Sequence, residues 1–189
     1  MKLGIFLSIL LCVATVHADE NQNRIGIGAG FNFQNIDNHD LDHRSEKYHG
    51  YKDSFNSELS FSAFYERVFS KPMSGVLMYT FNTFNQSDEG GGSNKDVDLE
   101  IHAVYAAVKP KIEIWGVQSF LMLGLGGMYV DADQIGSPLG PAWLVGVGMD
   151  FPVTERIGFE ILSTYTSGIG NNIGDYGYAT LEAGITFGF

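Results

Sequence analysis

The segment 178–189 constrains the fold of this chain more than any other, because its side chains alternate between apolar and small or polar. Its odd positions from 181 onward carry apolar residues: Leu181, Ala183, Ile185, Phe187 and Phe189. Its even positions carry Thr180, Glu182, Gly184, Thr186 and Gly188. A period of two predicts a β-strand with one apolar and one polar face. An exposed edge of this kind promotes aggregation in water, so the apolar face is predicted to lie against an apolar environment.

The same alternation recurs along the chain, separated by polar or proline-containing stretches. We predict eight strands, over 24–33, 56–69, 74–84, 96–108, 117–131, 142–150, 156–166 and 176–189. Most reach the roughly 9–11 residues that a tilted strand needs to cross a bilayer. Short connections, at 70–73, at 109–111 with the residues that follow, and at 151–155, alternate with longer polar ones at 34–55, 85–95, 132–141 and 167–175. This layout predicts an all-β fold, a closed eight-stranded antiparallel up-and-down transmembrane β-barrel.

The two faces of the predicted strands differ in charge. One face is apolar in most strands, for example at Ile25, Ile27, Leu59, Phe61, Leu99, Ile101, Tyr105, Trp143 and Val145. The other is glycine, small and polar, or acidic, and the lysines fall in the predicted turns and loops. A charged group facing hydrocarbon costs about 2–4 kcal/mol at mid-bilayer, so we expect the charged face to line the interior.

Two stretches resemble known outer-membrane proteins. Glu182, Gly184, Phe187 and the final Phe189 resemble the C-terminal insertion signal of bacterial outer-membrane barrels. The region 121–189, with its glycine-rich strand at 123–128, resembles the small eight-stranded barrel family of the OmpA membrane domain, OmpX and the opacity proteins. The resemblance implies a monomer in the outer membrane of a Gram-negative bacterium, in contact with outer-membrane lipid and inserted by the barrel-assembly machinery.

The N-terminal segment 1–18 has the layout of a secretory signal peptide: Lys2, an apolar stretch, and Val16-His17-Ala18 before Asp19. We predict cleavage between Ala18 and Asp19, which leaves residues 19–189 as one barrel domain. The formal net charge of the whole chain is −11, so nucleic acid is not expected as a partner.

The interior of the predicted barrel is expected to hold a polar network, because buried charges are normally paired. The predicted members are Arg156, Glu160, Glu182, Glu100 and His102, with Arg156 four residues from Glu160 on one face of a strand. The same residues leave open a second interpretation, a gated conduit or proton path. Val76, Met78, Phe84, Phe120 and Met122 are also expected to point inward, either as packing or as the lining of a small apolar pocket.

Candidate chemistry is sparse. His102 is the only histidine in any predicted strand, and no nucleophile, base and orienting group come together around it. We therefore expect no enzymatic activity and no cofactor. Residues 37–49 contain His39 and His43 among several acids, so this loop is either a hydrated surface loop or a metal site.

The sequence thus favours an outer-membrane barrel with a structural, surface-interaction or adhesin-like role. Its partners are then host or cell-surface ligands that bind the extracellular loops. The alternative is a narrow porin-like or OmpW-like conduit for small ionic or hydrophobic solutes. A lipid-modifying enzyme is the third and least favoured function.

Overall fold

The computed structural model describes residues 23–34, 55–70, 72–86, 97–115, 117–132, 138–170, 173 and 176–189. Its eight strands are β1 Asn23–Gln34, β2 Phe55–Ser70, β3 Met73–Gln86, β4 Val97–Ile114, β5 Val117–Ala132, β6 Leu139–Pro152, β7 Ile157–Gly168 and β8 Gly177–Gly188. None of the described residues forms a helix long and apolar enough to cross a membrane.

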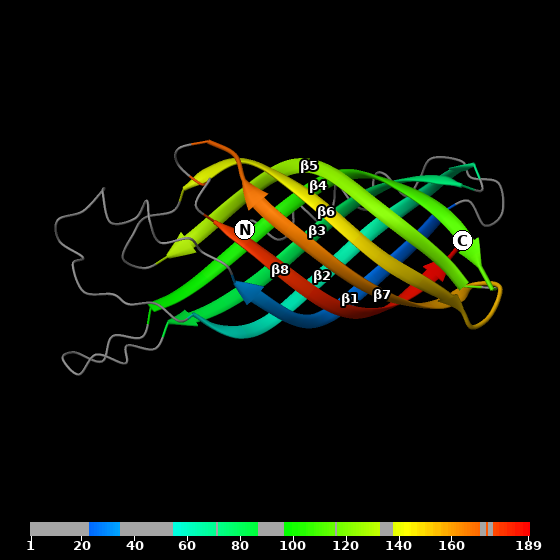
Figure 1. Ribbon diagram of the computed structural model, residues 1–189, viewed down its shortest axis with the longest axis horizontal. Helices are drawn as coiled ribbons and strands as arrows, with labels where there is room; N and C mark the ends of the chain where they lie inside the picture. The colour runs from blue at the N-terminus through cyan, green and yellow to red at the C-terminus, as the bar shows by residue number, and fades with distance from the viewer. Residues whose placement is uncertain are drawn as a thin grey trace.

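The strands form one closed barrel in chain order, with every neighbouring pair antiparallel (Figure 1). β8 closes the barrel by pairing with β1, and Ile27 lies opposite Ile185 in that pair. The strands run obliquely to the long axis (Figure 1), as closure of a sheet requires. The predicted fold class and number of strands are confirmed.

The barrel has two different ends. Residues 71–72, 115–116 and 153–156 join strands at one end, which we call the turn end. Residues 35–54, 87–96, 133–138 and 169–176 join strands at the opposite end, the loop end. At the turn end, the Thr154 hydroxyl accepts hydrogen bonds from the backbone N–H groups of Arg156 and Ile157.

Side chains alternate between the lumen and the outer face along each strand. The outer face is apolar and exposed in β1, β2, β6 and β8, as predicted, for example at Ile27, Phe61, Val147 and Ile185. The lumen is filled with buried side chains, and Val76, Met78, Phe84, Phe120 and Met122 all belong to this interior, as expected.

Strand β4 differs from the prediction in both its length and its faces. It continues through Pro110 to Ile114, so the predicted connection that begins at Lys109 starts too early, and only residues 115–116 join β4 to β5. Its odd positions, including Leu99, Ile101 and Tyr105, are buried in the lumen rather than exposed. The alternation was ambiguous here because both faces of β4 are apolar between residues 103 and 108.

Candidate functional site

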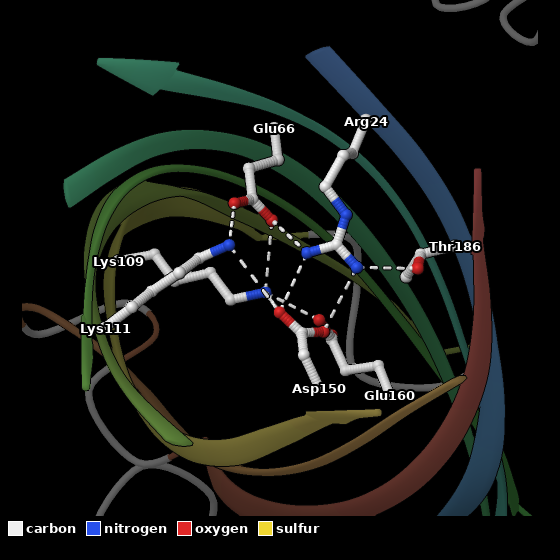
Figure 2. Close-up of polar contacts among 7 residues, drawn as sticks. All are labelled: Arg24, Glu66, Lys109, Lys111, Asp150, Glu160 and Thr186. Atoms are coloured by element: carbon white, nitrogen blue, oxygen red, sulfur yellow. Dashed lines mark hydrogen bonds and ion pairs between the residues drawn. The ribbon is translucent and has the colours of Figure 1, made fainter. Parts of the chain in front are cut away.

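Six charged side chains meet in the lumen near the turn end (Figure 2). They come from five strands: Arg24 of β1, Glu66 of β2, Lys109 and Lys111 of β4, Asp150 of β6 and Glu160 of β7. We call them the ion cluster. Three are basic and three acidic, so their charges balance when all are ionised.

Lys109 occupies the centre of the ion cluster. Its Nζ lies 2.6 Å from Glu160 Oε2, 3.2 Å from Glu66 Oε2 and 3.6 Å from Asp150 Oδ2. The same ammonium lies 3.8 Å from the centroid of the Phe120 ring, within cation–π distance. Contacts on several sides fix this side chain in a fully buried position.

Arg24 and Lys111 complete the neutralisation of the acids. Arg24 donates to Asp150 Oδ2 at 2.8 Å and to the Thr186 hydroxyl at 2.7 Å. Lys111 forms ion pairs with Glu66 and with Asp150. Glu66 and Asp150 therefore each contact all three cations, an arrangement that offsets the cost of burying them.

The three carboxylates of the ion cluster lie close enough together to hold a metal ion. Lys109 places its ammonium within 3.6 Å of all of them, however, in the position that such an ion would take. The Lys109 ammonium therefore supplies the positive charge that a metal ion would supply between these three carboxylates.

A second polar level lies on the loop-end side of the ion cluster. Glu182 of β8 accepts hydrogen bonds from the hydroxyls of Ser60 and Ser62 of β2. Tyr178, also on β8, reaches across the lumen to β3, where its hydroxyl oxygen lies 3.1 Å from Asn82 Nδ2. This level is built from hydroxyl, amide and carboxylate groups.

Apolar side chains separate the two polar levels. Phe64 lies between Ser62 and Glu66 along the luminal face of β2, and Leu162 lies between Glu160 and Thr164 on β7. Met78, Phe120 and Met122 fill the space around them. The lumen is thus occupied by charged, apolar and polar side chains in succession.

A recess opens at the turn end of the described structure. It has a volume of about 690 Å³, and Arg24, Lys111 and Asp150 form part of its lining. Thr154, Glu155 and Arg156 line it from the turn. The recess is a vestibule that leads to the ion cluster.

The structure brings together only some of the predicted interior residues. Glu160 and Glu182 are buried in the lumen, at different levels. Arg156 is exposed on the turn before β7, so Glu160 pairs with Lys109 and not with the predicted Arg156. The reason is local, since the chain from Val153 to Arg156 forms the turn and β7 begins only at Ile157.

Glu100 and His102 lie on the outer face of β4, not in the lumen as predicted. His102 Nδ1 is 2.8 Å from the Tyr79 hydroxyl, and its Nε2 is 3.7 Å from Glu100 Oε2. Both residues are near the loop end, beyond the apolar part of the outer face that begins at Val104. Polar side chains can face outward there. A prediction that places every polar strand residue in the lumen is therefore wrong for Glu100 and His102.

Of the six residues in the ion cluster, the predicted network contained only Glu160. Pro110 stands between Lys109 and Lys111, so the sequence predicts a turn there and places both lysines outside the strands. Lys109 and Lys111 are two residues apart, so in a continued strand both side chains lie on the same face as Leu99, Ile101, Ala103, Tyr105 and Ala107. This spacing could have predicted that the strand continues past Pro110. Two lysines on one face of a strand identify that face as the interior.

The residues of the C-terminal signal lie where strand alternation puts them. Glu182 faces the lumen, Phe187 and Phe189 are exposed on the outer face, and Gly184 pairs with Gly28 of β1. Their role as an insertion signal stays a prediction. Ala18, Asp19 and the loop 37–49 lie outside the described residues, so cleavage and metal binding stay predictions too.

Comparison with known proteins supports the same architecture. A family model described as "outer membrane protein beta-barrel domain" matches residues 4–189. No curated protein sequence matches the chain.

Solved structures of bacterial surface proteins share the fold. The attachment invasion locus protein Ail of Yersinia pestis, in complex with the heparin analogue sucrose octasulfate, is 18% identical with a TM-score of 0.59, over 90% of this chain and 100% of Ail. Neisserial surface protein A is 14% identical with a TM-score of 0.62, over 91% and 100%. OprG of Pseudomonas aeruginosa is 13% identical with a TM-score of 0.53, over 89% and 97%.

These identities establish the fold alone, whereas the family match extends over nearly the whole sequence. The turn end is accordingly periplasmic and the loop end extracellular, because outer-membrane barrels have short periplasmic turns and longer extracellular loops. The chain belongs to the outer membrane protein β-barrel family and lies in the outer membrane of a Gram-negative bacterium.

Proposed function

We propose that this barrel is a rigid outer-membrane scaffold that binds surface ligands through its extracellular connections and does not conduct solutes. The observation that carries the proposal is the filled lumen. From the vestibule toward the loop end, the lumen holds first the ion cluster, then apolar side chains such as Phe64, and then Glu182 with its serine partners. Because side chains fill the lumen, we expect the function of the barrel to depend on its extracellular surface.

The filled interior argues against the conduit. An eight-stranded barrel is just wide enough for side chains to fill. Tyr105, Met78 and Lys109 are almost completely buried inside it. The apolar residues that were candidates for lining a pocket belong to the packed interior, which leaves the vestibule ending at Lys111 and Asp150.

The charge of the extracellular connections narrows the class of ligand. Acidic residues outnumber basic ones in residues 35–54 and again in residues 87–96. The compound in complex with Ail, sucrose octasulfate, is polysulfated and therefore strongly anionic. Like charges repel, so we propose that this chain differs in its preference and binds neutral or positively charged regions of host or cell-surface molecules.

Binding can be tested on cells that display the full chain. Replacing residues 35–54 with a glycine–serine linker of equal length is expected to reduce attachment to host cells several-fold. The same replacement of residues 87–96 separates the contributions of the two connections, and heparin-coated beads serve as the polyanionic comparison. Unchanged attachment in both variants, at equal surface levels, contradicts the proposal.

Conduction is tested separately in planar lipid bilayers. The refolded protein is expected to give no discrete current steps, while a general porin in the same membrane gives them. Reproducible unitary events from this protein would favour the conduit instead.

We also propose that the barrel has no catalytic role. Among the described residues the one histidine is His102, and its position on the outer face near Tyr79 gives it no adjacent serine or cysteine nucleophile. Expression in a Gram-negative host is expected to leave the mass spectrum of lipid A unchanged. A new lipid A species that requires the chain contradicts this.

A further inference from the structure

Glu182 presents a buried negative charge in the middle of the lumen. Its exposure is 3%, and its two carboxylate oxygens accept hydrogen bonds from Ser60 and Ser62. The carboxylate lies over Gly28 of β1, where an added Cβ would come within 3.1 Å of Oε2. A glycine at position 28 therefore gives this carboxylate its space.

Within the part of the chain that the structure describes, no basic side chain forms an ion pair with Glu182. Arg24, Lys109 and Lys111 are engaged with the acids of the ion cluster. Phe64 lies between Glu66 of that cluster and Ser62 along β2, and Leu162 lies directly opposite Glu182 in the β7–β8 pair. A buried carboxylate without a compensating charge is costly, so this charge calls for a counterion that the side chains do not supply.

Asn82 provides a second, independent indication. It is fully buried and lies opposite Ser60 in the β2–β3 pair. Its Nδ2 donates to the Tyr178 hydroxyl, but no residue that the structure describes donates a hydrogen bond to its Oδ1. An unsatisfied buried carbonyl oxygen next to the serine that contacts Glu182 marks a place for a positively charged ligand.

We propose that Glu182 binds a monovalent alkali cation inside the lumen. The Glu182 carboxylate supplies the charge, and Asn82 Oδ1 and the serine hydroxyl oxygens supply neutral ligands. Oxygen ligands suit hard cations. One carboxylate balances one positive charge, whereas divalent sites such as those for Ca²⁺ commonly gather several carboxylates. The site is separate from the ion cluster, where the Lys109 ammonium neutralises the carboxylates.

Refolding in defined salts tests the proposal, because the barrel closes around the ion as it folds. The protein is refolded from urea into detergent in sodium chloride or in tetramethylammonium chloride at equal concentration, since the second cation is too large for the site. The midpoint of thermal unfolding is expected to be roughly 3 °C higher in sodium chloride. Equal midpoints in the two salts overturn the proposal.

Two variants assign the effect to Glu182. E182Q keeps the shape of the side chain and removes its charge, so the difference between the salts is expected to vanish. E155Q removes a charge from the exposed periplasmic turn and is expected to keep the difference. A salt difference that persists in E182Q overturns the assignment.

Crystals grown in rubidium chloride give a direct measurement that does not depend on any variant folding. An anomalous peak beside the Glu182 carboxylate and Asn82 is expected. The competing occupant is a proton on Glu182. No anomalous peak, together with a wild-type stability that depends on pH but not on the cation, identifies the proton and overturns the proposal.

Discussion

Lys109 of β4 and Glu160 of β7 are joined across the lumen, with 2.6 Å between Nζ and Oε2. Their strands are not neighbours in the barrel, so no backbone hydrogen bond connects them. The pair therefore braces opposite walls at the level where the vestibule ends. Within the described chain, Lys109 is also the one cationic group within ion-pair distance of Glu160.

Replacing Lys109 is expected to destabilise the barrel strongly. K109M keeps a side chain of similar length but leaves Glu160 buried without its cation. Breaking a buried ion pair from one side costs about 3–5 kcal/mol. Urea unfolding in lipid vesicles measures the loss, and R156Q serves as the control, because Arg156 is exposed and a change within about 0.5 kcal/mol is expected.

The double variant K109M/E160Q separates charge from packing. It removes one positive and one negative charge, so the remaining Arg24, Lys111, Glu66 and Asp150 stay balanced. We expect it to recover most of the stability lost in K109M. A double variant no more stable than K109M would show that Lys109 acts through its contact with Phe120.

Two adjacent glycines of β5 are expected to respond differently to alanine. A Cβ at Gly126 would lie 1.8 Å from the backbone oxygen of Val104, whereas one at Gly127 would find its nearest atom at 3.8 Å. Gly126 faces the lumen opposite Tyr105, where the backbones of β4 and β5 approach closely. G126A must shift a strand, at a cost of about 1–3 kcal/mol.

G127A is the matched control, and its unfolding free energy is expected to stay within about 0.5 kcal/mol of wild type. The same urea titration serves both variants. Equal stabilities for G126A and G127A would contradict the close approach of β4 to β5.

The barrel itself could be predicted because most strands have one face that tolerates only apolar residues. In β1, Ile25 and Ile27 alternate with glycines, and in β8 Leu181 and Ile185 alternate with polar residues. A shift of one residue exchanges the two faces, so such strands have a single acceptable register. Four of the eight strands carry a pattern this clear on the outer face: β1, β2, β6 and β8.

The interior could not be predicted to the same extent, because ion pairs across a lumen join residues far apart in sequence. Lys109 and Glu160 lie 51 positions apart. Which strands face each other depends on the tilt of the strands, which sequence alternation leaves undetermined. In β4, Pro110 also concealed the continuation of the strand to Lys111.

The two tryptophans are expected to report which part of the barrel contacts lipid. Trp115 is 100% exposed at the periplasmic end, after the last residue of β4. Trp143 lies on the outer face of β6, with its ring centroid 5.4 Å from that of Tyr165. In vesicles, W115F leaves Trp143 as the emitter and W143F leaves Trp115.

Brominated lipids are expected to quench the emission of W115F more strongly than that of W143F. Acrylamide in the aqueous phase is expected to do the opposite. The reverse pattern for both quenchers would place β6 outside the bilayer and contradict the assignment of the outer face.

Phe189 is expected to matter for assembly more than for stability. Its backbone closes the barrel, since its N–H donates to Asn23 O at 3.0 Å and its carbonyl accepts from Asn23 N at 3.3 Å. F189A keeps both hydrogen bonds and removes an aromatic ring that is 39% exposed on the outer face. Its stability after refolding in vitro is therefore expected to change by less than about 1 kcal/mol.

In cells the same variant is expected to reach the outer membrane at several-fold lower levels, because the terminal aromatic residue is predicted to be part of the insertion signal. The control is F33A, which removes an exposed aromatic ring from the extracellular end of β1 and leaves that signal intact. Quantifying folded protein in outer-membrane fractions, by its shifted mobility in unheated gels, measures both variants. Equal levels of F189A and F33A would mean that Phe189 contributes as one more lipid-facing residue and carries no separate signal for assembly.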